Sequence, residues 1–228
     1  MTWPSSFSPG TLGYMKDRIA DEIARADITS QIAVAVSDAI TIYQRQRFRF
    51  SESRDSTFNT VIDQEFYTSA DNPAISNLFY FDYLTIQVGF ANFDVPRYQP
   101  ETLELLSQTG TQKGQPYAYS YYNEVIRLYP VPSAVYQMRI GAHLLIAAPA
   151  TDTEVGNRWM TDAERLIRAR AKYELALNVT KDADEIQINS PEPPAPGQAA
   201  GMAYMALKDL RGEANRLLAR GMITAMQF

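Results

Sequence analysis

The spacing of apolar residues changes twice along this 228-residue chain, and that change limits the folds it can form. Near both ends, apolar residues recur three or four positions apart, as on one face of an α-helix. In the middle they occupy alternate positions, as in a half-buried β-strand. The sequence therefore predicts helices, then strands, then helices again.

Four longer segments carry the helical spacing. The first spans 11–25, and the second starts near residue 29 or 30 and ends in the arginine-rich stretch 45–50. The last two span about 162–181 and 198–220. A short amphipathic helix cannot bury its apolar stripe alone, so we expect both ends of the chain to pack into one bundle. The stripes comprise Leu12, Met15, Ile19, Ile23 and Ala26; Ile32, Val36, Ile40 and Tyr43; Leu166, Ala169, Tyr173, Ala176 and Leu177; and Ala203, Leu207, Leu210, Ala214 and Leu217.

The sequence pattern in the middle of the chain predicts antiparallel β-structure. The strongest alternation lies in 78–90, and a tight turn at Asn123-Glu124 separates two further strands. A short helix is expected within 98–108. These signals predict a meander or a small sandwich. The expected inward face of the strongest strand holds Leu78, Tyr80, Leu84, Ile86, Val88 and Phe90.

The predicted class is α+β, a four-helix bundle-like domain interrupted by an antiparallel β insert. Residues 1–50 and 156–189 are expected to form the helical bundle, and 51–155 the insert. Residues 190–228 are expected to form a proline linker and a C-terminal helical arm. Four prolines fall within 191–196, a composition that is stiff and extended and cannot be helical.

The composition excludes several kinds of chemistry. The chain has no cysteine and one histidine, His143, so disulfides, thiolate metal sites and a His-based metal cluster within one chain are ruled out. A Ser-His-Asp triad would have to use His143, which we interpret as structural because no nucleophile motif accompanies it. No cofactor is implied. No stretch approaches the roughly 18 apolar residues that a membrane span needs, and the first residues lack the pattern of a signal peptide.

Two groups of carboxylates invite a functional interpretation. Asp182, Asp184 and Glu185 could hold a hard cation, but they lack EF-hand spacing and are more typical of a solvated helix end. Asp152 and Glu154 could be a glycosidase pair, although nothing in the sequence marks their separation or burial.

Charge is divided unevenly. Residues 51–155 hold 5 basic and 12 acidic residues, a net of −7, whereas the rest of the chain has a net of +2. The overall −5 argues against a general nucleic-acid binder. Two basic clusters lie in the helical segments, and they fit either contact with a polyanion or acidic partner, or solvated helix faces. They comprise Arg45, Arg47 and Arg49, and Arg165, Arg168, Arg170 and Lys172.

Tyrosines are concentrated at the start of one predicted strand. Tyr117, Tyr119 and Tyr121 alternate there, which favours sheet packing or a protein interface over stacking on bases, given the acidic insert. The apolar last residues, which include Met222, Ile223 and Phe228, would gain from a partner that covers them.

Several motifs resemble the head-to-tail adaptors of short-tailed bacteriophages, also called head completion or tail tubular proteins. Residues 113–119 and 125–132 resemble the G-x-P and L-R-L-Y-P-x-P stretch of that family. The strand at 135–146, with Tyr136 and Arg139, is similar to its Y-x-L-R-I strand. The segment 159–176 is similar to its helix after the β region. The resemblance covers roughly residues 8–182.

The resemblance implies a structural virion protein without catalytic function, assembled in the host cytoplasm. Such adaptors form a ring, usually a dodecamer, that joins the portal to the tail nozzle and often the fibres. DNA passes through the lumen without sequence-specific binding. We expect portal or partner contacts at Arg45, Arg47, Arg49, Arg165, Arg168, Lys172, Met222, Ile223 and Phe228, and tail-side contacts at Tyr117, Tyr119 and Tyr121.

Two alternatives remain open from the sequence. One is an adaptor that also cleaves peptidoglycan, with Asp152 and Glu154 as its carboxylates. The other is a nucleic-acid-binding protein that uses the arginine clusters, whose affinity would fall steeply with salt.

Overall fold

The computed structural model describes residues 6–107 and 112–221, with side chains as far as residue 213. The chain forms two compact units, a helical unit of residues 1–50 and 146–228 and a β unit of residues 51–145. The predicted α+β class is confirmed. The second crossing between the units falls at residue 145, ten residues before the position expected from the sequence. With these boundaries the β unit holds 5 basic and 10 acidic residues, and the helical unit is neutral with 16 of each.

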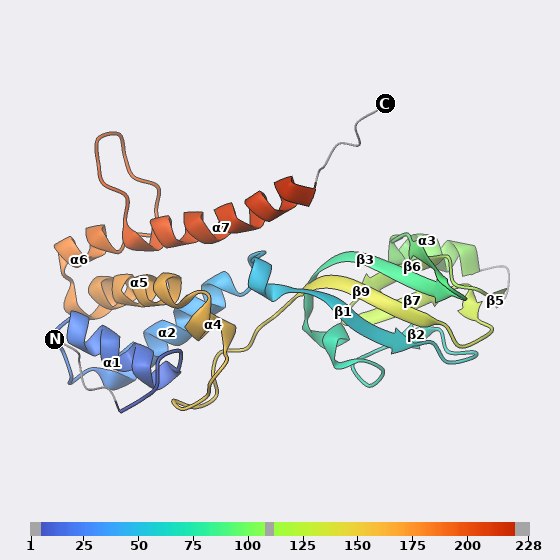
Figure 1. Cartoon of the computed structure of the whole chain (residues 1–228), viewed down its shortest axis with the longest axis horizontal. Helices are drawn as coiled ribbons and strands as arrows, with labels where there is room; N and C mark the ends of the chain where they lie inside the picture. The colour runs from blue at the N-terminus through green and yellow to red at the C-terminus, as the bar shows by residue number, and fades with distance from the viewer. Residues whose placement is uncertain (1–5, 108–111, 222–228) are drawn as a thin grey trace. The chain divides into compact units, whose positions relative to one another are not determined.

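The helical unit is built around one central helix, α5, which packs against α1, α2 and α7 (Figure 1). Leu166 and Ile167 of α5 are fully buried, together with Ile32 and Ile40 of α2. Most of the apolar stripe residues expected for these helices contribute to this core. The expectation is wrong for Leu177, which is 46% exposed, and for Ala26, which is exposed beyond the end of α1. Ala214 and Leu217 lie outside the residues whose side chains are described. The elements are α1 (Leu12–Glu22), α2 (Thr29–Tyr43), η1 (Arg49–Ser51), α4 (Arg158–Thr161), α5 (Glu164–Leu175), the π-helix η3 (Ala176–Thr180), α6 (Ala183–Ile188) and α7 (Met202–Gly221).

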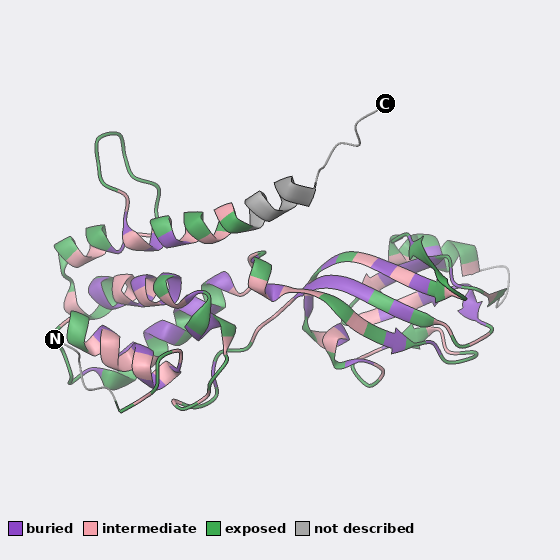
Figure 2. Ribbon diagram, viewed as in Figure 1, coloured by how far each residue is buried: buried purple, intermediate pink, exposed green. Residues whose placement is uncertain are grey.

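The proline-rich segment between α6 and α7 folds back on itself. The amide of Tyr204 donates to the carbonyl of Ser190 at 3.2 Å, which joins the two ends of the segment. Figure 1 shows it as a loop that leaves and returns beside the same helices, and Figure 2 shows that its middle is exposed. The proline run is not helical, and the loop that contains it returns the chain to the helical unit. Ala203 and Ala206 of α7 are buried against the helical core.

The β unit contains two main antiparallel sheets that enclose a core. One sheet has the order β1-β9-β3-β4 and the other β2-β7-β6, while β5 and β8 form a short parallel pair. The buried residues between the sheets include Leu84, Ile86, Ile126 and Leu128. The elements are β1 (Glu52–Asn59), β2 (Phe66–Tyr67), η2 (Pro73–Asn77), β3 (Leu78–Val88), β4 (Ala91–Val95), α3 (Pro100–Ser107), β5 (Lys113–Gly114), β6 (Ala118–Tyr122), β7 (Val125–Tyr129), β8 (Val131–Pro132) and β9 (Gln137–Leu144).

The tight turn expected at Asn123-Glu124 is confirmed. Both residues have positive φ values, 50° and 61°, as in a two-residue hairpin turn whose twist matches the flanking strands. This hairpin joins β6 to β7 with Tyr122 opposite Val125. The short helix expected within 98–108 is also present as α3.

One expected face of β3 is wrong because the strand is irregular. The register of β3 against β9 shifts between Leu78 and Tyr80 and again between Phe81 and Tyr83. A shift of one residue exchanges the two faces of a strand. Phe81 therefore lies in the core at 8% exposure, whereas Tyr80 is 43% exposed. Phe90, expected on the inward face, is fully exposed beyond the end of the strand.

No helix within the described residues is long and apolar enough to cross a membrane.

Candidate assembly surfaces

Two residues of the second basic cluster lie in an ion-pair network between α1 and α5. Glu22 of α1 approaches both, with Oε1 3.4 Å from Arg168 Nη1 and Oε2 2.9 Å from Lys172 Nζ. Glu164 Oε1 lies 3.0 Å from Arg168 and 3.2 Å from Arg18. The Arg168 and Lys172 side chains are only 13% and 11% exposed. Their charges are therefore balanced inside the helical unit, where they hold α1 on α5.

The other two residues of that cluster differ in their exposure. Arg170 is largely covered, pairs with Glu174 one turn later, and lies over the ring of Tyr173 at 5.1 Å. Arg165 keeps about half of its side chain exposed, and its closest carboxylate, Asp209 of α7, is 3.7 Å away. Arg165 is thus the residue of this cluster that remains accessible to a partner.

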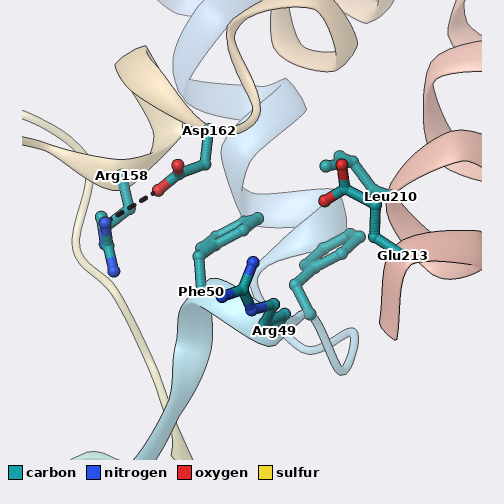
Figure 3. A pocket seen from close by; sticks show the side chains of 7 residues that line it. Arg49, Phe50, Arg158, Asp162, Leu210 and Glu213 are labelled. Carbon is teal, nitrogen blue, oxygen red and sulfur yellow. Dashed lines mark ion pairs between the residues drawn. The ribbon is translucent and has the colours of Figure 1, made fainter. Parts of the chain in front are cut away.

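The arginine-rich end of α2 leads into a pocket with an aromatic floor (Figure 3). Phe48 and Phe50 stack with their ring centroids 5.1 Å apart, and Trp159 meets both rings edge-on at 6.0 and 5.2 Å. The indole of Trp159 also donates to the carbonyl of Ile146 at 2.8 Å. Phe48 and Trp159 are buried, so this aromatic cluster fixes the backbone that carries the three arginines.

The rim of this pocket carries both signs of charge. Arg49 lies over the floor, Arg158 pairs with Asp162 at 3.2 Å on one side, and Glu213 of α7 lies on the other. The volume is about 320 Å³. A polyanion would be repelled by the two carboxylates, whereas a protein surface can supply partners of both signs over an apolar centre. Arg45 and Arg47 are exposed on the same segment.

A second recess lies between α2 and the end of α5 and is mainly apolar. Val34 of α2 and Val179 of the π-helix are exposed on its two sides. Ile42, two turns after Val34, is exposed on the same helix. Asp38 is the one charged residue in α2, so most of the exposed face of this helix is neutral or apolar. A helix face of this kind is typical of a surface that another chain covers.

The three tyrosines expected on the tail side lie in different environments. Tyr119 is 2% exposed and packs on Phe81 at 4.9 Å, and burial raises its pKa. Tyr121 is half-buried, and its hydroxyl donates to the carbonyl of Ile75 at 2.9 Å. Tyr117 is half exposed and meets the Tyr129 ring edge-on. Two of the three rings thus fill the space between the sheets, and Tyr117 alone of the three offers a wide contact surface.

A model of one protein family, described as SU10 adaptor protein, matches residues 11–225, which is nearly the whole chain. The chain belongs to the SU10 adaptor protein family. The search of curated proteins found no match. Membership makes the chain a structural phage adaptor and a virion component that contacts other head or tail proteins.

In this SU10 adaptor the two carboxylates considered for catalysis serve the local structure. Asp152 pairs with Lys16 at 2.6 Å, and its carbonyl accepts the amide of Gly13. Glu154 accepts the backbone amide of Ala150 at 2.7 Å and the side-chain amide of Asn157. The first of these hydrogen bonds is the main reason that the pKa of Glu154 is lowered. A general acid in glycoside hydrolysis needs a raised pKa instead.

The single histidine of the adaptor lies in a buried polar contact. His143 Nδ1 is 3.0 Å from the hydroxyl of Ser51, and its Nε2 is 3.8 Å from Asp82. The three residue types match a catalytic triad, but the serine and histidine are both buried, and the carboxylate is beyond hydrogen-bonding distance. This arrangement ties the start of β1 to the end of β9 rather than exposing a nucleophile.

The acidic cluster after the π-helix caps a helix. Asp182 Oδ1 accepts the amides of Asp184 and Glu185, which satisfies two free N–H groups at the start of α6. Within the described residues, no group of three acidic, histidine or cysteine side chains could hold a metal ion.

Three expected partner contacts, Met222, Ile223 and Phe228, lie outside the described residues. Sequence reasoning missed two surfaces, the neutral face of α2 around Val34 and the aromatic floor under Arg49. The nearly uncharged α2 sequence was a signal for the first. The second depends on Trp159, which is distant in sequence, and no local pattern could reveal it.

Proposed function

We propose that this SU10 adaptor forms a ring, a dodecamer, that joins the portal to the tail nozzle and fibres around the DNA exit channel. The proposal rests chiefly on the family match over residues 11–225. It is supported by the mainly apolar recess between Val34 of α2 and Val179 of the π-helix, which is suited to the neighbouring subunit in such a ring. The ring is assembled in the host cytoplasm and retained in the virion.

The portal meets the helical unit at the exposed arginines. Arg45, Arg47 and Arg49 follow α2, and Arg165 is the accessible member of the second cluster. The aromatic floor under Arg49 gives this surface an apolar centre, and apolar centres contribute most of the affinity of protein interfaces. The C-terminal residues Met222, Ile223 and Phe228 extend this contact. The acidic β unit lets DNA pass without adhesion, because like charges repel.

Binding to the portal tests the proposal directly. Purified adaptor mixed with the dodecameric portal is expected to form a stoichiometric ring complex visible by electron microscopy. Arg49→Glu is expected to weaken binding at least tenfold, because it reverses the charge above the pocket floor. Arg139→Glu, an exposed change on the β unit, is the matched control and leaves portal binding unchanged. Absence of a complex between folded wild-type adaptor and portal would overturn the proposal.

A further inference from the structure

The β3–β4 hairpin ends in an exposed aromatic residue. Its two-residue turn is Gly89-Phe90, with Gly89 at a φ of 61°, and Val88 faces Ala91 across it. The turn geometry requires glycine at the first position and makes no demand at the second. Phe90 is nevertheless a phenylalanine, and its side chain is fully exposed. A solvated aromatic ring at a hairpin tip stabilises nothing within the unit, so its apolar surface is available to a partner.

The strand after this turn is an edge strand whose outer side is open. β4 lies at the end of its sheet and pairs with β3 on one side. A two-residue turn makes Val88 and Ala91 a hydrogen-bonded pair, and such pairs alternate along an antiparallel ladder. The backbone groups of Asn92 and Asp94 therefore point away from β3. Residues 91–94 are all exposed, so these two donors and two acceptors are accessible.

The opposite edge of the same sheet is protected in ways that β4 is not. β1 carries a register irregularity between Ser53 and Ser56 and an exposed ion pair between Arg54 and Glu52. Bulges and charged side chains are common protections against unwanted strand pairing. The stretch 78–96, which contains β3 and β4, has no lysine or arginine. The β4 edge carries one charged residue, Asp94, and no bulge, so it is less protected against strand addition than the β1 edge.

The hairpin tip lies at the end of the sheet opposite to the end where the chain enters and leaves the β unit. Leu78 pairs with Leu144 at the end of the sheet where the chain enters and leaves the unit. Gln87 pairs with Gln137 at the other end, beside the tip. On one face of the hairpin, Phe93 lies opposite Ile86, and its ring is half exposed. An added strand would cover this ring and lengthen the apolar row.

We propose that β4 receives an extended segment of a tail-side virion protein as an added strand, and that Phe90 inserts into an apolar pocket of that protein. The inference rests on the proposed function, because it assumes that the β unit meets the tail. The segment presents apolar side chains next to Phe93 and basic ones next to Asp94. That charge preference follows from the hairpin itself, whose charged residues are the acidic Asp82 and Asp94. Strand addition of this kind takes its affinity from main-chain hydrogen bonds and its specificity from alternate side chains.

The test uses the complex of adaptor and portal, to which the purified nozzle and fibre proteins are added separately. Asn92→Pro removes an outward-pointing N–H while leaving the hydrogen bonds to β3 in place, and Asn92→Thr is the matched control that keeps the N–H. We expect Asn92→Pro and Phe90→Ser each to weaken binding of one tail protein at least tenfold, with portal binding and melting temperature unchanged. Asp94→Lys, which adds a protecting charge to the edge, should act in the same direction if the proline variant fails to fold.

Hydrogen exchange distinguishes strand addition from a contact at the tip alone. The amides of Asn92 and Asp94 should exchange quickly in the portal complex and become protected when the tail protein binds. The inference is overturned if these amides stay unprotected, if the variants bind as wild type does, if neither tail protein binds, or if protection arises from pairing of β4 with a second adaptor. If neither tail protein binds, the tail-joining part of the proposed function fails as well. In the other cases, intact binding to the portal and to a tail protein would leave the proposed function standing.

Discussion

Gly201 lies against the backbone of Ser190, so close that a Cβ on the glycine would be 2.4 Å from the serine carbonyl oxygen. The two residues close the proline-rich loop at the point where α7 begins. Gly201→Ala is expected to destabilise the fold by about 1–3 kcal/mol, because the clash is with backbone and no side-chain rotation relieves it. Chemical denaturation would measure the change.

Gly212→Ala is the matched control for that substitution. Gly212 lies within α7, and a Cβ there meets nothing within 4 Å. Alanine is favoured over glycine in a helix interior, so this variant should be more stable by about 0.5–1 kcal/mol. Equal effects of the two substitutions would show that Gly201 is not in close contact with Ser190.

The elements of the fold were largely predictable, and the contacts between distant segments were not. The periodic spacing of apolar residues predicted the main helices, because each helix buries one apolar stripe. The Asn123-Glu124 pair predicted the turn between β6 and β7, where both residues have positive φ values. The return of the proline loop depends on Gly201 meeting Ser190, and neither residue carries a local signal of that meeting. The face of β3 was misassigned because its irregular register follows from pairing with β9.

Fewer features of the candidate surfaces could be predicted from the sequence, because the exposure of a side chain also depends on contacts with distant segments. Arginine and lysine side chains are usually solvated, but Arg168 and Lys172 form ion pairs with Glu22 of another helix and are largely buried. Tyr119 has the same spacing as Tyr117, yet the second sheet covers one ring and not the other. Whether a side chain is covered depends on what packs above it, which the local sequence does not contain.

Substitution of Leu166 tests whether α5 lies at the centre of the helical unit. Its side chain is fully buried among α1, α2 and α5 residues. Leu166→Ala should lower the free energy of unfolding by about 2–5 kcal/mol through lost burial and the cavity left behind. Val34→Ala, on the exposed face of α2, should change it by less than about 0.5 kcal/mol. A small effect at Leu166 would show that the helix face is misassigned.

Substitutions of Tyr121, in β6, and Tyr117, which directly precedes β6, should separate effects on stability from effects on binding. Tyr121→Phe removes the hydrogen bond to the Ile75 carbonyl and should cost about 1 kcal/mol in unfolding experiments. Binding to tail proteins should be unchanged, because that hydroxyl is occupied within the unit. Tyr117→Ala should weaken tail binding with little loss of stability, since its ring is half exposed. The reverse pattern would contradict the assignment.

Glu154 should titrate below the ordinary range of a glutamate. Its folded-state pKa is lowered mainly by the Ala150 amide, so its contribution to stability is present above the unfolded pKa, about 4.3, and is lost as pH falls through the folded value. An NMR titration of the carboxyl carbon would measure the midpoint. A midpoint above 4.3, together with peptidoglycan clearing in a zymogram that Glu154→Gln abolishes, would support a lytic adaptor instead.

Truncations at two positions distinguish the structural role of α7 from its role in assembly. Ala203 and Ala206 of α7 are buried in the helical unit, so removal of residues 190–228 should lower the melting temperature sharply.

Removal of residues 214–228 keeps those buried contacts and deletes Met222, Ile223 and Phe228. This shorter deletion should melt close to wild type and bind the portal at least tenfold more weakly, because it removes the apolar end proposed to reach the portal. Thermal melting and portal binding measured on both truncations separate the two effects. Wild-type affinity in the shorter deletion would remove these three residues from the portal contact and leave the arginines after α2 as its main determinant.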